Sequence, residues 1–301
     1  MIQPKITVIG SINMDLVTRT STIPKVGETV LGESFHTIPG GKGANQAVAA
    51  ARLGADVTLI GCVGNDGFGN MLKEHLQEQG INTEYIKTVE GISTGIASIT
   101  LSQGDNSIIV VSGANNEVTP ALITDYEQVI AKSDLILLQL EIQVKAVIEA
   151  VRLAKKHKVP VILNPAPIQK LPKDLLLQID CLTPNEHEQT VLLSSIDEDE
   201  LYKLKEKCIV TKGENGVTIY QNQKESTIPS YKVNVIDTTG AGDTFNGALA
   251  VSLSKGKTLQ EACYFANAAA ALSVTKLGAQ TGMPTLEEVE TFLGDSPQNN
   301  I

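Results

Sequence analysis

The sequence predicts one α/β domain over residues 1–301: a doubly wound, mostly parallel β-sheet flanked by helices, with a small antiparallel β lid. Short apolar runs alternate with helical patterns along most of the chain, which is typical of a parallel sheet covered on both faces. Polar side chains directly follow these runs, as expected where strand ends open on one edge of the sheet. Two other segments, about 11–38 and 95–112, alternate and contain turn signals, so we assign them to the lid.

Apolar runs, helix caps and turns locate the individual elements. Residues 6–10 are an apolar run bounded by polar residues, which indicates a buried strand. Thr119 followed by Pro120 is the pattern that opens a helix. The run at 135–140 has no polar alternation, so we expect a strand buried on both faces. We expect further strands at 57–61, 159–163, 181–183, 209–211 and around 233–236, a hairpin from 217, and helices at 39–53, 70–79, 144–157, 198–207, 244–254, 258–274 and 285–293.

Composition excludes several classes of partner. A formal charge of −10 and a pI of about 5.0 disfavour binding to nucleic acid, because the surface repels phosphate backbones. No apolar run approaches the roughly 18 residues that span a membrane. The four cysteines form no C-x-x-C pair, so we expect reduced, buried thiols in a cytoplasmic protein. The four histidines show no metal-ligand spacing.

The segment 237–247, Asp-Thr-Thr-Gly-Ala-Gly-Asp-Thr-Phe-Asn-Gly, carries the strongest indication of chemistry. Its residues Gly240, Ala241 and Gly242 leave backbone N–H groups uncovered at the start of a helix, where anions bind. Asp243 adds a carboxylate beside that anion site, which suits a base that deprotonates a hydroxyl as it attacks a phosphate. The alternative is a glycine-rich turn in which Asp243 only caps the helix.

Two familiar nucleotide-binding motifs are absent from the sequence. The segment 39–46 is not a P-loop, because Gly43 follows Lys42 where Ser or Thr is required. The turn after the first strand reads Gly-Ser-Ile-Asn and lacks the dinucleotide-binding glycine pattern. The polar residues at strand ends are instead hydrogen-bonding groups for a polyol, or else ordinary turn formers; they are Asn13, Asp15, Glu141, Asn185, Glu188, Lys212, Gly213 and Asp243.

Two long strings, one from Gly40 to Gly69 and one from Asp237 to Gly247, resemble the two signatures of the PfkB carbohydrate kinases, also called the ribokinase family. The resemblance spans nearly the whole chain. It implies a ribokinase-like fold, ATP with Mg²⁺ as phosphoryl donor, K⁺ as activator and a homodimer formed through the lid. Within the family, the sequence Gly-Gly-Lys-Gly-Ala-Asn-Gln at 40–46 favours D-ribose as the substrate, phosphorylated at O5 to D-ribose 5-phosphate.

Other activities stay open on the sequence. They are another sugar or nucleoside kinase of the family, such as a fructokinase, ketodeoxygluconate kinase or adenosine kinase, and a non-catalytic sugar-binding regulator. The intact Gly240-Ala241-Gly242-Asp243 string disfavours the regulator, which has no use for a base at that position.

The resemblance also implies a role for individual residues. Asp243 is the general base, and Gly240, Ala241 and Gly242 form the anion hole. The sugar-binding positions are Asn13, Met14, Asp15, Gly41, Lys42, Gly43, Asn45, Glu141 and Asp243. The nucleotide-binding positions are Asn185, Glu188, Thr211, Lys212, Gly213, Gly216, Gly242 and Asn267. The positions matching the K⁺ ligands are Asp237, Thr239, Ser273, Lys276, Gly278 and Gly282, the last standing where Ser is expected.

Overall fold

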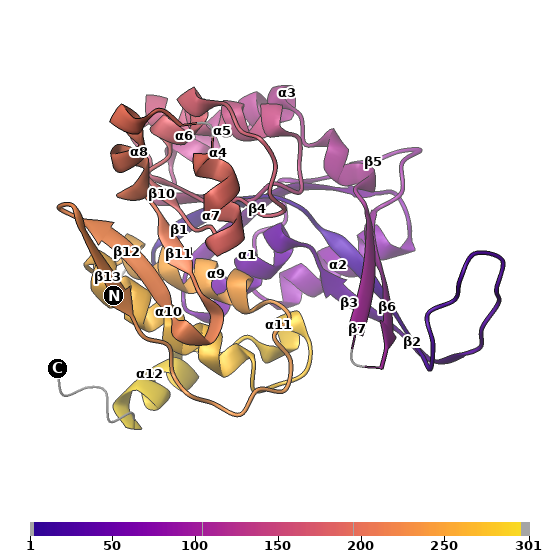
Figure 1. Ribbon diagram of the computed structural model, residues 1–301. Helices are drawn as coiled ribbons and strands as arrows, with labels where there is room; N and C mark the ends of the chain where they lie inside the picture. Colours follow the sequence, from indigo (N-terminus) through magenta and orange to yellow (C-terminus); the bar gives the residue numbers. More distant parts are fainter. Residues whose placement is uncertain (1–2, 104, 195, 296–301) are drawn as a thin grey trace.

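A six-stranded sheet forms the centre of the computed structural model, which describes residues 3–103, 105–194 and 196–295 (Figure 1). Its strand order is β10-β9-β8-β1-β4-β5, and each neighbouring pair is parallel. This arrangement confirms the predicted doubly wound sheet. The strands are β1 (Lys5–Ile9), β4 (Asp56–Gly64), β5 (Ile86–Val89), β8 (Leu135–Leu138), β9 (Val161–Leu163) and β10 (Cys181–Leu182).

Helices cover both faces of this sheet, and each face has its own apolar core. In β1, Ile6 and Val8 join one core while Ile9 joins the other, because successive strand residues point to opposite faces. One layer contains α1 (Lys42–Arg52), α2 (Gly67–Glu78), α9 (Ala241–Ser254), α10 (Leu259–Ser273), α11 (Ala279–Gly282) and α12 (Leu286–Asp295). The other contains α3 (Pro120–Asp125), α4 (Glu127–Ala131), α5 (Val144–Lys156), α6 (Lys173–Gln178), α7 (Glu186–Leu193) and α8 (Glu198–Lys205), and the short 3₁₀ turns are η1 (Gly113–Glu117) and η2 (Gly213–Asn215).

A second sheet, of order β3-β2-β6-β7, projects from the body at the right of Figure 1. Its strands are β2 (Asn13–Thr20), β3 (Gly32–Gly40), β6 (Gly95–Ser102) and β7 (Asp105–Val111). The two predicted segments do form one small sheet, but it is mixed and not wholly antiparallel. The hairpins β2/β3 and β6/β7 are antiparallel, whereas β2 pairs with β6 in parallel. Asn13 lies opposite Gly95, so both strands start at the body and run outward together.

The carboxyl-terminal third contains a three-stranded antiparallel sheet of β11 (Ile209–Thr211), β12 (Val217–Gln221) and β13 (Lys224–Ile228). Two isolated parallel bridges connect β11 with the end of the main sheet. The expected strand around 233–236 was wrong, because this stretch forms no ladder. The N–H groups of Ile236 and Asp237 instead donate to Val274 O, at 2.8 and 3.2 Å. The side chains of Val235 and Ile236 are exposed, so this segment lacks the burial that a central strand requires.

All four cysteines are buried as free thiols. Burial raises the pKa of Cys62, Cys208 and Cys263 to about 12, and it raises the pKa of Cys181 well above its ordinary value. No helix within the described residues is long and apolar enough to cross a bilayer.

Candidate active site

The carboxylate of Asp243 is buried and held by hydrogen bonds on both oxygens. Asn45 Nδ2 donates to Oδ2 at 2.9 Å, and Gln46 Nε2 donates to Oδ1 at 3.0 Å. Only 7% of Asp243 is exposed. Both donors come from α1, so the packing of α1 against α9 fixes the direction of the carboxylate. Asp243 therefore does more than cap its own helix.

The start of α9 has the geometry of an anion site. Gly240 is the N-cap, with φ 78° and ψ 2°, a left-handed conformation that favours glycine. The first turn of a helix leaves N–H groups without intrahelical acceptors. Ala241 N donates to Thr238 O at 3.2 Å, while the next residue, Gly242, is exposed beside the buried Asp243. A Cβ on Gly242 would meet no atom within 4 Å, so the space in front of this turn is open.

A cluster of sugar-binding candidates lies at the carboxyl ends of β1 and β8. Glu141 Oε2 accepts hydrogen bonds from Ser11 Oγ at 2.5 Å and from Lys42 N at 3.1 Å. The Ser11 hydroxyl also accepts from Gly43 N at 3.2 Å. This clamp fastens the start of α1 to the two strand ends. Since chain order reverses between β1 and β8, the cluster lies at the switch point where ligands bind in such sheets.

Asp15 and Lys42 have perturbed acidities. Burial, with the nearby carboxylates of Glu141 and Asp243, raises the pKa of Asp15 to about 7. Burial acts to lower the pKa of the Lys42 ammonium, but the charges of Asp243, Glu141 and Glu188 act in the opposite direction, and the net pKa is raised. Lys42 therefore stays protonated among these carboxylates. Perturbed groups gathered in this way are typical of functional sites.

Glycines and a buried asparagine set the shape of this cluster. A Cβ on Gly40 would lie 2.5 Å from Asp15 Oδ2, so only glycine leaves room for that carboxylate. Asn13 Oδ1 accepts from Asn115 Nδ2 at 2.7 Å, and Asn115 also binds both backbone polar groups of Ile12. Met14 differs from the other sugar-binding candidates because its side chain is fully buried in the core.

Several residues of this site were not among the sequence candidates. Gln46 was inside the quoted string without a role, yet it binds Asp243 directly. Ser11, whose hydroxyl donates to Glu141, was also given no role. The others are buried amides that no local sequence pattern singles out, and only the fold brings them together. They are Asn115, Gln139, Asn164 and Gln280.

The nucleotide-binding candidates lie at the ends of β10 and β11. Asn185 and Glu188 form a capping box at the start of α7: Asn185 N donates to Glu188 Oε2 and Glu188 N donates to Asn185 Oδ1, both at 2.8 Å. Thr211 pairs with Asn185 through an isolated bridge, which brings the two segments together. The turn Lys212 to Gly216 follows, and Lys212 Nζ lies 3.9 Å from Glu186 Oε1.

Two glycine positions and one asparagine complete this set. Gly213 and Gly216 both have positive φ, of 55° and 82°. A Cβ on Gly216 would lie 2.1 Å from Ile228 O, so the turn packs tightly on β13. Asn267 is buried on α10, where its Nδ2 donates to Ile228 O and Pro229 O, at 3.2 and 3.0 Å. In this structure its amide group therefore fastens α10 to β13.

The candidate cation ligands come together from two loops. Asp237 Oδ1 accepts from Thr239 N and Oγ1, and Asp237 Oδ2 accepts from Gly278 N. Burial acts to raise the pKa of Asp237, but these hydrogen bonds outweigh it and the pKa is lowered. A Cβ on Gly282 would lie 2.5 Å from Ser273 O and 3.6 Å from Lys276 O. These carbonyls thus converge at Gly282, where a side chain has no room.

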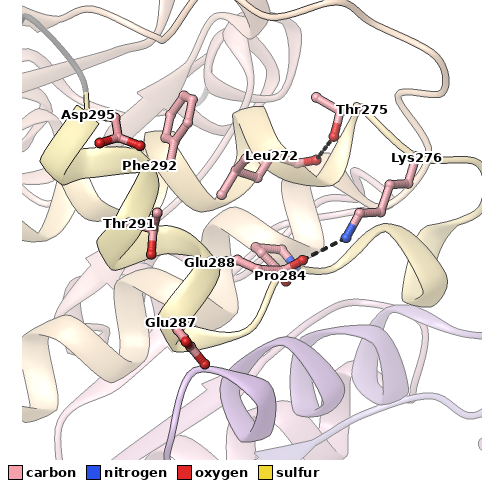
Figure 2. A pocket seen from close by; sticks show the side chains of 9 residues that line it. All are labelled: Leu272, Thr275, Lys276, Pro284, Glu287, Glu288, Thr291, Phe292 and Asp295. Carbon is pink, nitrogen blue, oxygen red and sulfur yellow. Dashed lines mark hydrogen bonds and ion pairs between the residues drawn. The ribbon is translucent and has the colours of Figure 1, made fainter.

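Two surface pockets lie away from the sugar and nucleotide candidates, although Lys276 of the candidate cation ligands lines one of them. One, of about 430 Å³, lies between α10 and α12, and Figure 2 shows the Lys276–Glu288 ion pair of 2.9 Å at its side. The other, of about 660 Å³, lies beside α2 and is lined by residues such as Lys73 and Asn82. No cluster of three or more metal-ligating His, Cys, Asp or Glu side chains occurs among the described residues.

Comparison with known proteins defines the class. A model of the pfkB family of carbohydrate kinases matches residues 3–286, and the chain belongs to this family. It is 48% identical over 289 residues to a ribokinase from Bacillus subtilis, covering 96% of this chain and 99% of the relative. It is 36% identical over 300 residues to a deoxyribokinase from Salmonella typhi, covering 96% of this chain and 98% of the relative.

A solved structure of a relative with ribose and ATP bound has the same fold. The Arabidopsis thaliana ribokinase complexed with ribose and ATP is 34% identical to this chain, with a TM-score of 0.90. The match covers 98% of this chain and all of the other.

Proposed function

We propose that this protein transfers the terminal phosphoryl group of ATP to O5 of D-ribose, giving D-ribose 5-phosphate and ADP. The observation that carries the proposal is the buried Asp243 carboxylate, aimed by Asn45 and Gln46 beside the open N-terminus of α9. Family membership, the likeness to the B. subtilis ribokinase and the ribose–ATP complex of the Arabidopsis ribokinase all support it.

In the proposed reaction Asp243 takes the proton of the 5-hydroxyl as its oxygen attacks the γ-phosphorus. The bond to the β-phosphate oxygen breaks and ADP leaves. Negative charge on the transferred group then lies in front of Gly240, Ala241 and Gly242, where helix N–H groups and the helix dipole stabilise it. Such positioning and electrostatic stabilisation supply most of the catalysis in phosphoryl transfer.

The sugar is held by the cluster at the ends of β1 and β8. Carboxylates of Asp15 and Glu141 accept hydrogen bonds from neighbouring sugar hydroxyls, while Asn13, Asn45 and Lys42 contribute amide and ammonium groups. Ser11 and Lys42 N hold Glu141 Oε2, and Gly40 leaves the space that Asp15 occupies. The main contribution of Gly41 and Gly43 is a close approach of the α1 backbone to β1.

ATP lies over the ends of β10 and β11 in this proposal. Thr211, Lys212, Gly213, Gly216 and Asn267 border the nucleotide. Mg²⁺ typically retains several waters and is held by one or two carboxylates together with substrate phosphates. Glu188, already oriented by the capping box, fits that role through water. When bound there, the ion would supply positive charge against the phosphates in a site that contains several carboxylates.

The proposal includes a monovalent-cation site between the loops of Asp237 and Lys276. The Asp237 carboxylate stays ionised because its pKa is lowered, and the carbonyls of Ser273 and Lys276 converge nearby. In this proposal K⁺ binds oxygen ligands from Asp237, Thr239, Ser273, Lys276 and Gly278. Gly282 contributes no side-chain ligand, since Ser there would place its Cβ 2.5 Å from Ser273 O in this backbone.

The four-stranded sheet β3-β2-β6-β7 serves as the lid and as the surface of a homodimer. Its strand β2 starts at Asn13, directly beside the sugar cluster, so the sheet is placed to exclude water from the reaction. Strand β7 is exposed along its whole length and includes Ile108, Ile109, Val110 and Val111. An apolar exposed strand of this kind is typical of a protein–protein contact.

The test is an ADP-release assay with ATP and Mg²⁺ over ribose, 2-deoxyribose, fructose, adenosine and ketodeoxygluconate. Deoxyribose is included because the Salmonella relative is a deoxyribokinase. We expect ribose to give the highest kcat/KM, and the product to carry phosphate on O5 by ³¹P–¹H correlation NMR. If another compound is phosphorylated and ribose is not, ribose is refuted as the substrate, but the assignment to the family still holds.

A further inference from the structure

Behind Asp243 a chain of side-chain hydrogen bonds crosses from α9 to α2. Asn45 Nδ2 donates to Asp243 Oδ2 at 2.9 Å, and Asn45 Oδ1 accepts from Gln280 Nε2 at 2.9 Å. Gln280 Oε1 in turn pairs with His75 Nε2 at 2.7 Å. The chain therefore contains two amides between the carboxylate and the imidazole ring, and both amides are buried.

The direction of each amide is determined by its partners. A carboxylate only accepts hydrogen bonds, so Asn45 must turn its NH₂ toward Asp243. Its oxygen then faces Gln280, which must donate, and the oxygen of Gln280 faces His75 Nε2. His75 satisfies this oxygen whenever Nε2 carries a proton, in the neutral tautomer or in the charged ring. The acceptor at Asp243 and a donor at His75 therefore require the same orientation of both amides.

Gln280 is itself fixed in the backbone. Its carbonyl accepts from Arg52 Nη1 at 2.6 Å, and the same nitrogen donates to Met283 O at 2.9 Å. Arg52 Nε donates to Gln79 Oε1 at 3.0 Å. Gln280 is 3% exposed, so water does not compete for its amide. The last turn of α1 therefore holds α11 in place while the side chain of Gln280 faces Asn45.

The chain also limits what Asn45 offers to a ligand. Its oxygen is occupied by Gln280, and one amide hydrogen is directed at Asp243. As a donor, Asn45 keeps a single free N–H beside the carboxylate. A sugar hydroxyl that gives its proton to Asp243 can accept a hydrogen bond from that donor on its oxygen, which stabilises the developing alkoxide.

We propose that Gln280 is a positioning residue for phosphoryl transfer, oriented by His75, and that it keeps the donor face of Asn45 toward Asp243. The inference rests on Asp243 being the base of the proposed function. Neither Gln280 nor His75 touches the reacting atoms. Their contribution is the direction of the Asn45 amide: a reversed amide would place Oδ1 against the carboxylate and turn a hydrogen bond into a repulsion.

The decisive variant is Gln280→Glu, which keeps size but replaces the donor by an oxygen. The ionised carboxylate that this change introduces accepts only, so Asn45 then lies between two acceptors and can donate to Asp243 only by leaving its Oδ1 against residue 280. We expect kcat to fall roughly 10- to 100-fold, the range for losing a hydrogen bond to a charged group, with the KM for ATP unchanged. Rates are measured on whichever sugar the wild-type protein phosphorylates, so failure with ribose alone does not decide this inference.

Variants at the far end of the chain separate positioning from stability. His75→Leu removes the terminal donor and should lower kcat, whereas His75→Gln, whose amide can donate from the same place, should restore at least half of the wild-type kcat. The matched control is Gln79→Leu, which removes a hydrogen bond of Arg52 without touching the chain and should keep wild-type kcat. Thermal melting is recorded for every variant.

Three results would overturn the inference. The first is wild-type kcat in Gln280→Glu. The second is an equal fall of kcat in His75→Leu and His75→Gln, and the third is the same fall in the Gln79→Leu control, because a purely structural role would not depend on a donor at position 75. If any variant melts below the assay temperature, kcat is measured below that variant's own melting point and compared with wild type at the same temperature.

Discussion

At the residue scale, the burial of Asp243 is balanced by its hydrogen bonds. An ionised carboxylate without partners inside a protein costs several kcal/mol. Here Asn45 and Gln46 each donate to one oxygen, so the charge is stabilised in one direction before any ligand arrives. Such preorganisation suits a general base, because the surrounding dipoles do not have to reorient when the proton is transferred.

Asp243→Asn tests this role. The amide retains the shape of the side chain but cannot take a proton, so kcat should fall ~10² to 10⁴-fold, the usual contribution of a general base. The affinity for the sugar, measured by calorimetry with the ATP site empty, should stay within a few-fold of wild type. Wild-type turnover in this variant would remove Asp243 from the role.

The raised pKa of Asp15 predicts a pH dependence of sugar binding. The carboxyl group titrates at about 7 in the folded protein, and in the proposed site only its ionised form accepts hydrogen bonds from sugar hydroxyls on both oxygens. The KM for ribose should therefore fall as pH rises through 7. In Asp15→Asn this dependence should disappear, and the KM should be high at every pH. A wild-type KM that is constant from pH 6 to 8 would contradict the assignment.

The same shift has a consequence for stability, with a definite sign. The folded-state pKa of about 7 exceeds the ordinary 3.8, so the folded protein binds this proton more tightly than the unfolded chain. The stabilisation is complete below pH 3.8 and is lost as pH rises through 7. Asp15→Asn should therefore raise the melting temperature more at pH 8 than at pH 5.

Individual residues differed in how far the sequence could place them. Asp243 and Asn45 lie in sequence motifs that indicate their functions, and in the structure they are hydrogen-bonded to each other. Gln280 and Asn115 are 235 and 102 residues from the partners they bind, Asn45 and Asn13. A lone amide has no local pattern, so only the fold could show that these residues belong to the site.

At the element scale, the site depends on how closely α1 and α9 approach each other. A Cβ on Gly247 would lie 2.6 Å from Ala49 Cβ and 3.0 Å from Gln46 O. The glycine of α9 therefore lies directly against the turn of α1 that carries Gln46. The small residues of α1 serve this close approach, which brings two amides within reach of Asp243.

Gly247→Ala should force the two helices apart. Overpacking of this kind costs about 1–3 kcal/mol in the free energy of unfolding, and the shift should also lower kcat by moving Gln46 away from Asp243. Urea unfolding and steady-state rates measure the two effects. Gly294→Ala on α12 is the control, because its Cβ would meet nothing within 4 Å. Equal stability of both variants would contradict close packing at Gly247.

Strand prediction succeeded where burial and pattern agreed. The run at 135–140 is apolar except for Gln139, and β8 lies in the centre of the sheet. The run around 233–236 is also mainly apolar, yet Val235 and Ile236 are exposed and the N–H group of Ile236 donates to Val274 O at the end of α10. A short apolar run alone does not distinguish a strand from an extended loop whose N–H groups are hydrogen-bonded to the end of a helix. Strand β5 was missed because its Ile-Lys-Thr-Val sequence is half polar.

At the scale of the whole molecule, the projecting sheet connects the proposed sugar site with the proposed dimer surface. Its inner end contains Asn13, a sugar-binding candidate, and its outer strand β7 exposes four consecutive apolar side chains. The sequence indicated both segments of this sheet, since alternation and turns are local signals. It did not indicate the parallel pairing of β2 with β6, because that depends on both strands leaving the body side by side.

Ile109→Lys tests the homodimer. The side chain is 66% exposed on β7. A lysine buried there in an apolar interface would lose its hydration without gaining a partner for its charge, which destabilises the dimer. We expect light scattering after gel filtration to show a dimer for the wild type and a monomer for the variant. Ile148→Lys on α5, also an exposed isoleucine, should remain dimeric. A wild-type monomer at micromolar concentration would contradict the proposed contact.

The rate at which the buried thiols are alkylated reports how often the α/β domain transiently unfolds around them. A thiol reacts as its thiolate, and burial keeps Cys62, Cys208 and Cys263 both protonated and covered. Alkylation in native buffer should therefore proceed only through transient unfolding, and saturating ribose with an ATP analogue should slow it. Mass spectrometry of the four sites over time would show whether the two cores on either side of the sheet open together or separately, since Cys62 and Cys208 belong to one and Cys181 and Cys263 to the other.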